Sequence, residues 1–327
     1  MFKFFNTNSF LAYAMLPFVL VIYRMRLILS PHIGQAASDS DLYTPLWEAT
    51  FGVLPEGSYG GVAIALVLTF LTAMIVNNTS NNFHFTTHQS HLSGMMFIVL
   101  SSGFVIGQGL HPVQVFAFLL TSALYRLMKG VRDVRLPYRF CFDAMMFISV
   151  GSLFWAKGVW FVPLVIISAG ILQILNIRTL LCFIFGFVAP YAIAFAVYYT
   201  VGVSIETYES HLQCLMVPVA FYKTTILGKV FVSLYGLLIL ISILSAIRNL
   251  SMLKIIESRM NRIIVWLILF STIFIVTPYF SFELQILVAA GGGIAVSVWL
   301  QRLRRAIWAE IITSSFALMT LYIQWNI

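Results

Sequence analysis

The sequence predicts an all-α membrane protein, a polytopic bundle of about ten or eleven transmembrane helices, from three observations. First, 61% of the 327 residues are hydrophobic and 9% are charged, whereas soluble domains are about 45–50% apolar and about 25% charged. Second, the apolar residues form successive runs close to the roughly 20 residues that a helix needs to cross a bilayer. Third, Lys and Arg gather near the ends of these runs. Helices are favoured because lipid offers no partner to an unpaired backbone group.

The first half of the chain contains five expected spans. The first is interrupted by Pro17, which removes a backbone donor. A polar connection follows, in which residues 43–51 are expected to form a short interfacial helix because Trp and Tyr favour the headgroup level. Gly103 and Gly107 in the third span have the spacing typical of close helix packing. The expected spans are about 10–29, 61–76, 92–110, 112–128 and 141–156.

The second half contains six further spans and a long polar connection at 202–229. Pro190 is expected to kink one span. Gly291, Gly292 and Gly293 lie inside another span, so they favour close helix packing rather than phosphate binding. The expected spans are about 159–177, 180–201, 230–247, 263–277, 284–300 and 306–323. Because no polar tract is long enough for a separate soluble domain, we expect one integral-membrane domain over residues 1–327.

A basic connection near the middle of the chain predicts the orientation. Five cations lie between residues 126 and 139, and Lys and Arg near span ends are retained in the cytoplasm. The N-terminus is then cytoplasmic, and the polar connections at about 30–60 and 202–229 are outer loops. This arrangement places all but five of the 19 Lys and Arg in the cytoplasm, the exceptions being Arg24, Arg26, Lys157, Lys223 and Lys229.

Four segments are similar to a known family: 82–109, 111–127 (HPVQVFAFLLTSALYRL), 142–155 (FDAMMFISVGSLFW) and 186–195 (GFVAPYAIAF). They resemble an uncharacterised family of polytopic inner-membrane proteins of the Bacteroidetes, over roughly residues 82–201. The resemblance implies a multi-pass protein of the inner membrane. Some members bear a carotene-cleaving-oxygenase label, and members are often encoded near polyprenyl-phosphomannose synthases, which implies envelope glycan assembly. The family supplies no catalytic residues.

Acidic residues of the first outer loop are the candidate catalytic groups, namely Asp39, Asp41 and Glu48. One of them could act as a general base on an acceptor. Their position resembles that of the carboxylate in the first external loop of polytopic polyprenyl-phosphate-sugar glycosyltransferases. The alternative is a solvated acidic loop that is kept away from anionic headgroups.

Cations expected on the outer side are the candidate substrate-binding groups, namely Arg24, Arg26, Lys223 and Lys229. They could hold the phosphate of a polyprenyl carrier, to which Arg gives bidentate contacts. The alternative is pairing with outer acids, where an exposed pair contributes roughly 0–1 kcal/mol. The expected partners are membrane lipid and a polyprenyl-phosphate-linked substrate. Nucleic acid is not expected, because topology and anionic lipid explain the net charge of +8.

Three histidines have the spacing of a possible metal site. His84, His88 and His91 would share one face if their segment were helical, and could bind zinc, copper or iron. No acid lies nearby to orient them, so the favoured interpretation is a polar turn before the third span. We therefore expect no metal site and no cofactor. The three cysteines, Cys141, Cys182 and Cys214, fall on separate segments without ligand spacing.

Three functions remain open at this point. The first is an enzyme of lipid-linked glycan assembly at the outer face. The second is a transporter or flippase of a small or lipid-linked substrate, and essential midplane polar residues such as Gln108 or Ser149 would favour it. The third is a non-catalytic partner within an envelope complex.

Overall fold

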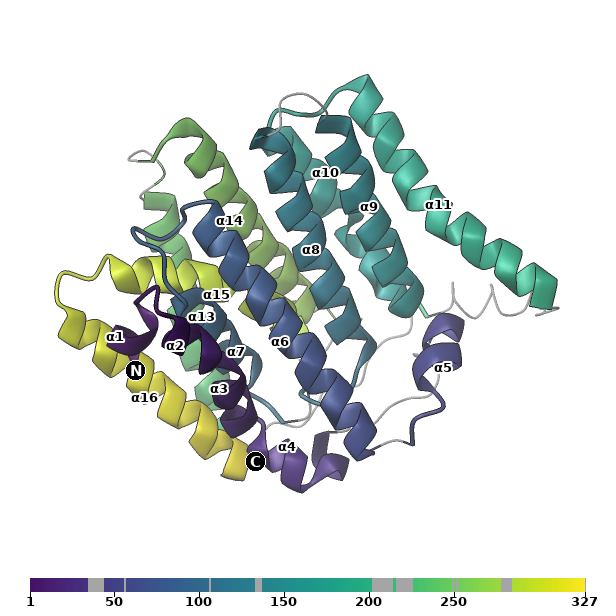
Figure 1. Ribbon diagram of the computed structural model, residues 1–327. Coiled ribbons are helices and arrows are strands. Elements are labelled where there is room, and N and C mark those ends of the chain that lie inside the picture. Colours follow the sequence, from purple (N-terminus) through teal and green to yellow (C-terminus); the bar gives the residue numbers. More distant parts are fainter. Residues whose placement is uncertain are drawn as a thin grey trace. The chain divides into compact units, whose positions relative to one another are not determined.

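The structure is a computed structural model that describes residues 1–34, 44–55, 57–105, 107–132, 137–201, 214–215, 226–248, 250, 253–277 and 284–326. All regular structure in these residues is helical, and they contain no β-strand (Figure 1). This confirms the predicted all-α class.

The chain divides into two compact units, each assembled from stretches that are far apart in sequence. The first unit comprises Met1–Ala36, Glu56–His111 and Ala220–Ile327, and the second comprises Ala37–Pro55 and Pro112–Val219. Nothing in the composition marks these boundaries, because apolar spans belong to both units. One integral-membrane domain over residues 1–327 stays a prediction.

Five described helices are long and apolar enough to cross a membrane, and we conclude that this is a membrane protein. They are α6 (Tyr59–Asn82), α11 (Ile177–Val201), α13 (Ile226–Arg248), α14 (Ile255–Val276) and α16 (Ala306–Asn326). The other expected spans correspond to helices that are shorter or carry more polar residues. The count of ten or eleven spans therefore stays a prediction.

The first unit is built around α15 (Gln285–Gln301), which is apolar on all sides. Every residue from Gln285 to Val298 is buried, as expected for a helix without a polar face. Three successive glycines each face a different neighbouring helix. A Cβ at Gly291 would lie 2.6 Å from Ile268 of α14, and one at Gly292 would lie 2.6 Å from Ile239 of α13. A Cβ at Gly293 would lie 3.0 Å from Phe97 of α7 (Leu92–Ser101). The predicted packing role of these glycines is confirmed.

The N-terminal part of the first unit is a broken series of short helices. They are α1 (Phe2–Phe5), α2 (Phe10–Ala14), α3 (Leu16–Tyr23), α4 (Met25–Leu29) and the 3-10 helix η1 (Pro31–Gly34). The sequence predicted one span across 10–29. Pro17 does not interrupt a helix there, because it lies in the first turn of α3, where its missing N–H costs no hydrogen bond. The breaks fall instead at Met15 and Arg24.

Two other boundaries differ from the predictions. Helix α14 begins at Ile255, so Arg259 and Arg262 lie in its first turns and not before the span that was expected to start at 263. The third expected span is helical only to Ser101. Gly103 closely approaches Gln285 of α15 and Phe231 of α13, since a Cβ there would lie 2.6 Å from the Phe231 ring, which is consistent with the predicted close packing.

The second unit contains α5 (Pro45–Phe51), α8 (Pro112–Arg132), α9 (Pro137–Phe154), η3 (Ala156–Phe161), α10 (Val162–Ile171) and α11. The helix predicted at 43–51 is confirmed as α5, which begins after Thr44. Phe116 of α8 packs against Trp155 and Phe161, with ring centroids 5.1 and 5.3 Å apart. The Phe116 ring can approach α9 this closely because residue 151 is glycine, since a Cβ there would lie 2.8 Å from the ring.

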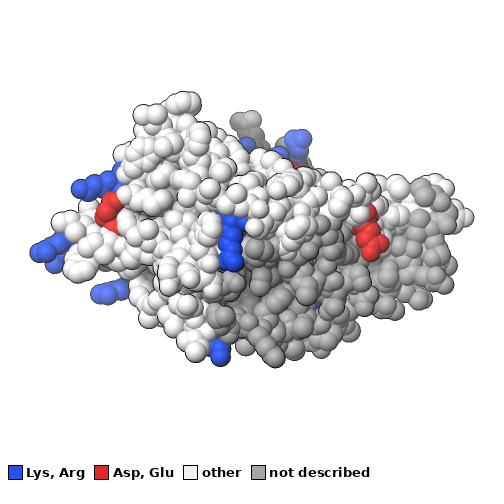
Figure 2. All heavy atoms as spheres, turned by 90° about the horizontal axis from the view of Figure 1, so that it is seen from below, with Lys and Arg blue, Asp and Glu red and all other residues white. Residues whose placement is uncertain are grey.

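Polar contacts within the second unit join α9 to α11. The Ser149 hydroxyl donates to the Phe187 carbonyl at 2.6 Å, in the turn before Pro190, and Ser152 and Tyr191 share a hydrogen bond of 2.8 Å. Serine side chains that bond to carbonyls near a proline are a common way to accommodate it in a membrane helix. Most of α11 exposes apolar side chains, including Ile177 and Tyr199, each 78% exposed. On the face in Figure 2, charged side chains are scattered among uncharged residues.

Candidate functional site

The candidate site begins where α7 ends inside the first unit. A helix end leaves up to four backbone carbonyls without intrahelical partners, and at membrane depth each needs a donor. Three glutamine amides supply donors. Gln285 of α15 donates to the Leu100 carbonyl at 2.7 Å, and Gln108 donates to the Ser102 carbonyl at 2.9 Å. Gln324 of α16 also donates to the Ser102 carbonyl. We call this set, together with Arg24, the glutamine cluster.

Arg24 contributes a buried cation to the glutamine cluster. It sits at the break between α3 and α4 and is 1% exposed. Its Nη1 donates to the Gln108 carbonyl at 2.8 Å. Its Nε is buried and has no hydrogen-bond partner among the described residues, which also provide no carboxylate to pair with it. The neighbouring Tyr23 hydroxyl donates to the Ala317 carbonyl of α16 at 3.1 Å, which holds this break against α16.

The structure describes three of the other predicted site residues, namely Arg26, Lys229 and Glu48. Arg26 is half-buried on α4, and its Nη1 has no hydrogen-bond partner among the described residues. Lys229 is exposed in the first turn of α13, also in the first unit. Glu48 is exposed on α5, which belongs to the second unit. Asp39, Asp41 and Lys223 lie outside the described residues.

The histidine segment does not have the geometry that a shared helical face would require. Residues 83–91 are not helical, and His84 has a φ of 54°. The His91 ring is buried and lies 3.0 Å from the Asn77 amide nitrogen, measured at Nδ1. His88 is exposed and contacts Thr87 at 3.1 Å. Within the described ranges, no three His, Cys, Asp or Glu side chains gather into a possible metal site.

A second glutamine marks the opposite end of α15. Gln301 donates to Asn6 at 2.7 Å and to Ser90 at 3.0 Å, and it accepts from Thr87. Since α15 rises about 1.5 Å per residue, Gln285 and Gln301 lie about 24 Å apart along the helix. The first unit therefore has a polar layer at each end of an apolar central helix. The layer with the glutamine cluster is the one that contains a buried charge.

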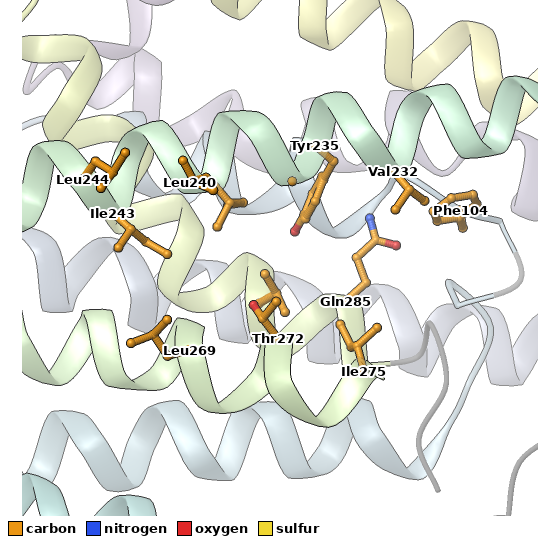
Figure 3. Close-up of a pocket in the computed structure, with 13 residues that line it drawn as sticks. Phe104, Val232, Tyr235, Leu240, Ile243, Leu244, Leu269, Thr272, Ile275 and Gln285 are labelled. Carbon is orange, nitrogen blue, oxygen red and sulfur yellow. The ribbon is translucent and has the colours of Figure 1, made fainter. Parts of the chain in front are cut away.

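An apolar cavity of about 490 Å³ adjoins the glutamine cluster in the first unit. It lies between α13 and α14, with Gln285 and Val288 of α15 also in its lining, and Figure 3 shows the side chains that face it. Gln285 belongs to both features, because it lines the cavity and donates to Leu100. The size is within the range of about 300–1,000 Å³ that is typical of ligand pockets.

Comparisons of this protein with family models, curated proteins and solved structures found no match.

Sequence reasoning had selected the cations near the span ends but missed most of the glutamine cluster. Gln108 had been considered only as a midplane polar residue. Gln285 and Gln324 are isolated glutamines at the ends of apolar runs, and nothing in the sequence around them distinguishes them as site residues. Their role depends on where α7 ends, and Gly103, the second residue after Ser101, is a local signal of a helix stop. That signal indicates the end of α7 but not which distant amides donate to it.

Proposed function

We propose that this protein is an inner-membrane carrier for a lipid-linked anionic substrate of cell-envelope glycan assembly. The observation that carries the proposal is the buried Arg24 guanidinium, whose Nε has no partner among the described residues. A buried charge without a counterion costs several kcal/mol, and ionisable groups at membrane depth are usually functional. A phosphate would supply the missing negative charge and acceptor oxygens.

The broken helices favour transport over a purely structural role. Transporters often place substrate and ion sites where membrane helices are discontinuous. Here α3 ends beside Arg24 and α7 ends at Ser101, and the Arg24 side chain meets the Gln108 carbonyl in the glutamine cluster. Resemblance of residues 82–201 to inner-membrane proteins of the Bacteroidetes supports the choice of membrane.

Transfer of a sugar from a polyprenyl phosphate at the outer face is the second candidate function. The exposure of Glu48 on the short helix α5 favours it, because a general base must reach its acceptor. Asp39 and Asp41 are the other candidate bases. Under this alternative Glu48→Gln, Asp39→Asn or Asp41→Asn abolishes sugar transfer, while lipid translocation is absent from the wild type.

Translocation of a fluorescent polyprenyl phosphate in proteoliposomes tests the proposal. Dithionite bleaches only the outer leaflet, so a carrier makes the inner-leaflet probe accessible. We expect Arg24→Met to abolish this accessibility. Arg24→Lys should retain a part of it, because Lys supplies charge but no bidentate contact. The matched control is Arg305→Met, which removes an exposed arginine and should translocate as the wild type does.

A measurement of stability separates binding from folding. Met replaces only the aliphatic part of the Arg side chain and carries no buried charge. Removal of the uncompensated charge should offset the lost hydrogen bond to the Gln108 carbonyl, so Arg24→Met should melt close to the wild type. A folded Arg24→Met protein that translocates the probe at the wild-type rate would refute the proposal.

A further inference from the structure

The cavity between α13 and α14 has an almost entirely apolar lining, unlike the surroundings of Arg24. The described residues of its lining include no charged one: their side chains are aliphatic and aromatic, apart from the amide of Gln285 and the hydroxyls of Tyr235 and Thr272. A charged headgroup placed there would lack a counterion and would cost several kcal/mol. The ligand class is therefore uncharged, which distinguishes this cavity from Arg24.

The cavity is long, and its two ends differ. From Val232 to Leu244 the axis of α13 rises about 18 Å, at about 1.5 Å per residue. Phe104, Tyr235 and Gln285 lie toward one end, and Leu244 and Leu269 toward the other (Figure 3). The first end thus adds two aromatic rings and an amide to the aliphatic Val232 and Ile275, whereas the other end is aliphatic only. This gradient matches a molecule with a flat polar head and a hydrocarbon tail, because aromatic side chains stack on flat rings.

Tyr235 provides the specific polar group. Its hydroxyl oxygen is buried and has no hydrogen-bond partner among the described residues, and Figure 3 shows it pointing into the space between the helices. The ring is held by Phe231 and Phe316, with centroids 6.1 and 6.2 Å away. A buried hydroxyl without a partner is costly, so a ligand oxygen that accepts its proton would remove that cost. The Thr272 hydroxyl already donates to the Ile268 carbonyl at 2.7 Å.

We infer that this cavity binds an uncharged isoprenoid lipid with a planar, carbonyl-bearing head, the chemistry of an isoprenoid quinone. The head lies between Phe104 and Tyr235, the Tyr235 hydroxyl donates to a head carbonyl, and the tail runs toward Leu244. The inference concerns binding only and includes no redox step. It does not depend on an anionic substrate at Arg24.

Gly236 offers a direct test, because a Cβ at this position would meet no atom within 4 Å. A leucine there would extend into the cavity from a Cβ position that contacts no protein atom. Gly170 of α10 is the matched control, since a Cβ there also meets no atom and the residue does not line the cavity. The full-length protein is titrated with menaquinone-4, and the dissociation constant is obtained from the ligand-induced rise in melting temperature.

We expect Gly236→Leu to abolish binding and Gly170→Leu to bind as the wild type does. Tyr235→Phe should weaken binding about tenfold, the factor that corresponds to about 1.4 kcal/mol for a hydrogen bond. Without ligand, Tyr235→Phe should melt no lower than the wild type, because it removes an unpartnered buried hydroxyl. If the Tyr235 hydroxyl only stabilised the fold, Tyr235→Phe would melt lower than the wild type and would bind menaquinone-4 equally well. The exposed Tyr322→Phe is its control.

Two further ligands test whether the cavity requires an oxygen-bearing head and whether it excludes a charged lipid. Squalane, a hydrocarbon with no oxygen, should bind at least tenfold more weakly than menaquinone-4, and phosphatidylglycerol should not compete at an equal mole fraction. Equal binding by squalane, competition by phosphatidylglycerol, or unchanged binding by either folded Gly236→Leu or Tyr235→Phe would overturn the inference.

Discussion

The contact between α7 and α15 should make Gly293 the glycine of α15 that is hardest to replace. Its Cβ position lies 3.0 Å from the backbone nitrogen of Phe97 and from the backbone oxygen of Ser93. Backbone atoms of a buried helix cannot rotate away, so alanine must separate the two helices by a few tenths of an ångström. Overpacking of this kind typically costs about 1–3 kcal/mol. The separation would also strain the hydrogen bond of 2.6 Å between the Ser93 and Ser297 hydroxyls.

Gly236→Ala is the matched variant for this prediction. Both substitutions replace a mid-helix glycine by alanine, so both gain about 0.5–1 kcal/mol of helix stability, and that gain cancels in the comparison. Gly236 has no atom within 4 Å of its Cβ position. The expected difference between the variants is therefore the packing cost of about 1–3 kcal/mol, or roughly 2–10 °C in melting temperature. The assay is thermal unfolding in mild detergent, followed by size-exclusion chromatography with fluorescence detection. If Gly293→Ala melts at or above the temperature of Gly236→Ala, the close approach of α7 and α15 is not limiting and the reasoning is refuted.

Two further predictions concern pH and topology. Burial lowers the pKa of His91 below its ordinary value near 6.5, so below that pH the unfolded chain binds more protons than the folded one. Stability is then retained above about pH 6.5 and lost as the pH falls toward the lowered pKa, by up to about 1.4 kcal/mol per pH unit. Between about pH 7.5 and 5.5, the melting temperature of His91→Asn should fall by less than that of the wild type. The exposed His88→Asn is the control, and its melting temperature should fall as much as that of the wild type. An equal fall in all three proteins would contradict the role of His91. For topology, single cysteines at Ser38 and Val131 are introduced after Cys141, Cys182 and Cys214 are replaced. An impermeant maleimide should label Ser38 in intact spheroplasts and Val131 only after permeabilisation, and the reverse pattern would invert the predicted orientation.

Composition and local pattern determined the class of this protein and most of its helices. A sequence with 61% hydrophobic and 9% charged residues cannot expose its apolar runs to water, and runs of span length can pair their backbone groups only as helices. Helices α6, α11, α13 and α16 follow directly from such runs. The same reasoning placed α5, because Trp47 and its neighbours sit in a polar connection. It also identified the glycines of α15 as packing residues, since no other role is available to small side chains within a span.

The tertiary structure alone decided which groups satisfy the end of α7 and what Arg24 does. The run at 92–110 is apolar, and its helix ends at Ser101, before Gly103. That end is possible because amides from Gln285 and Gln324, both distant in sequence, donate to its carbonyls. Arg24 was expected at an outer surface, among exposed cations. It is buried instead because α3 breaks beside Gln108, whose carbonyl accepts from it. Such partners come from different helices, and no local pattern specifies them. The cavity likewise depends on tertiary structure. The space beside Gly236 exists because of how α13, α14 and α15 pack together, and no local pattern specifies that packing.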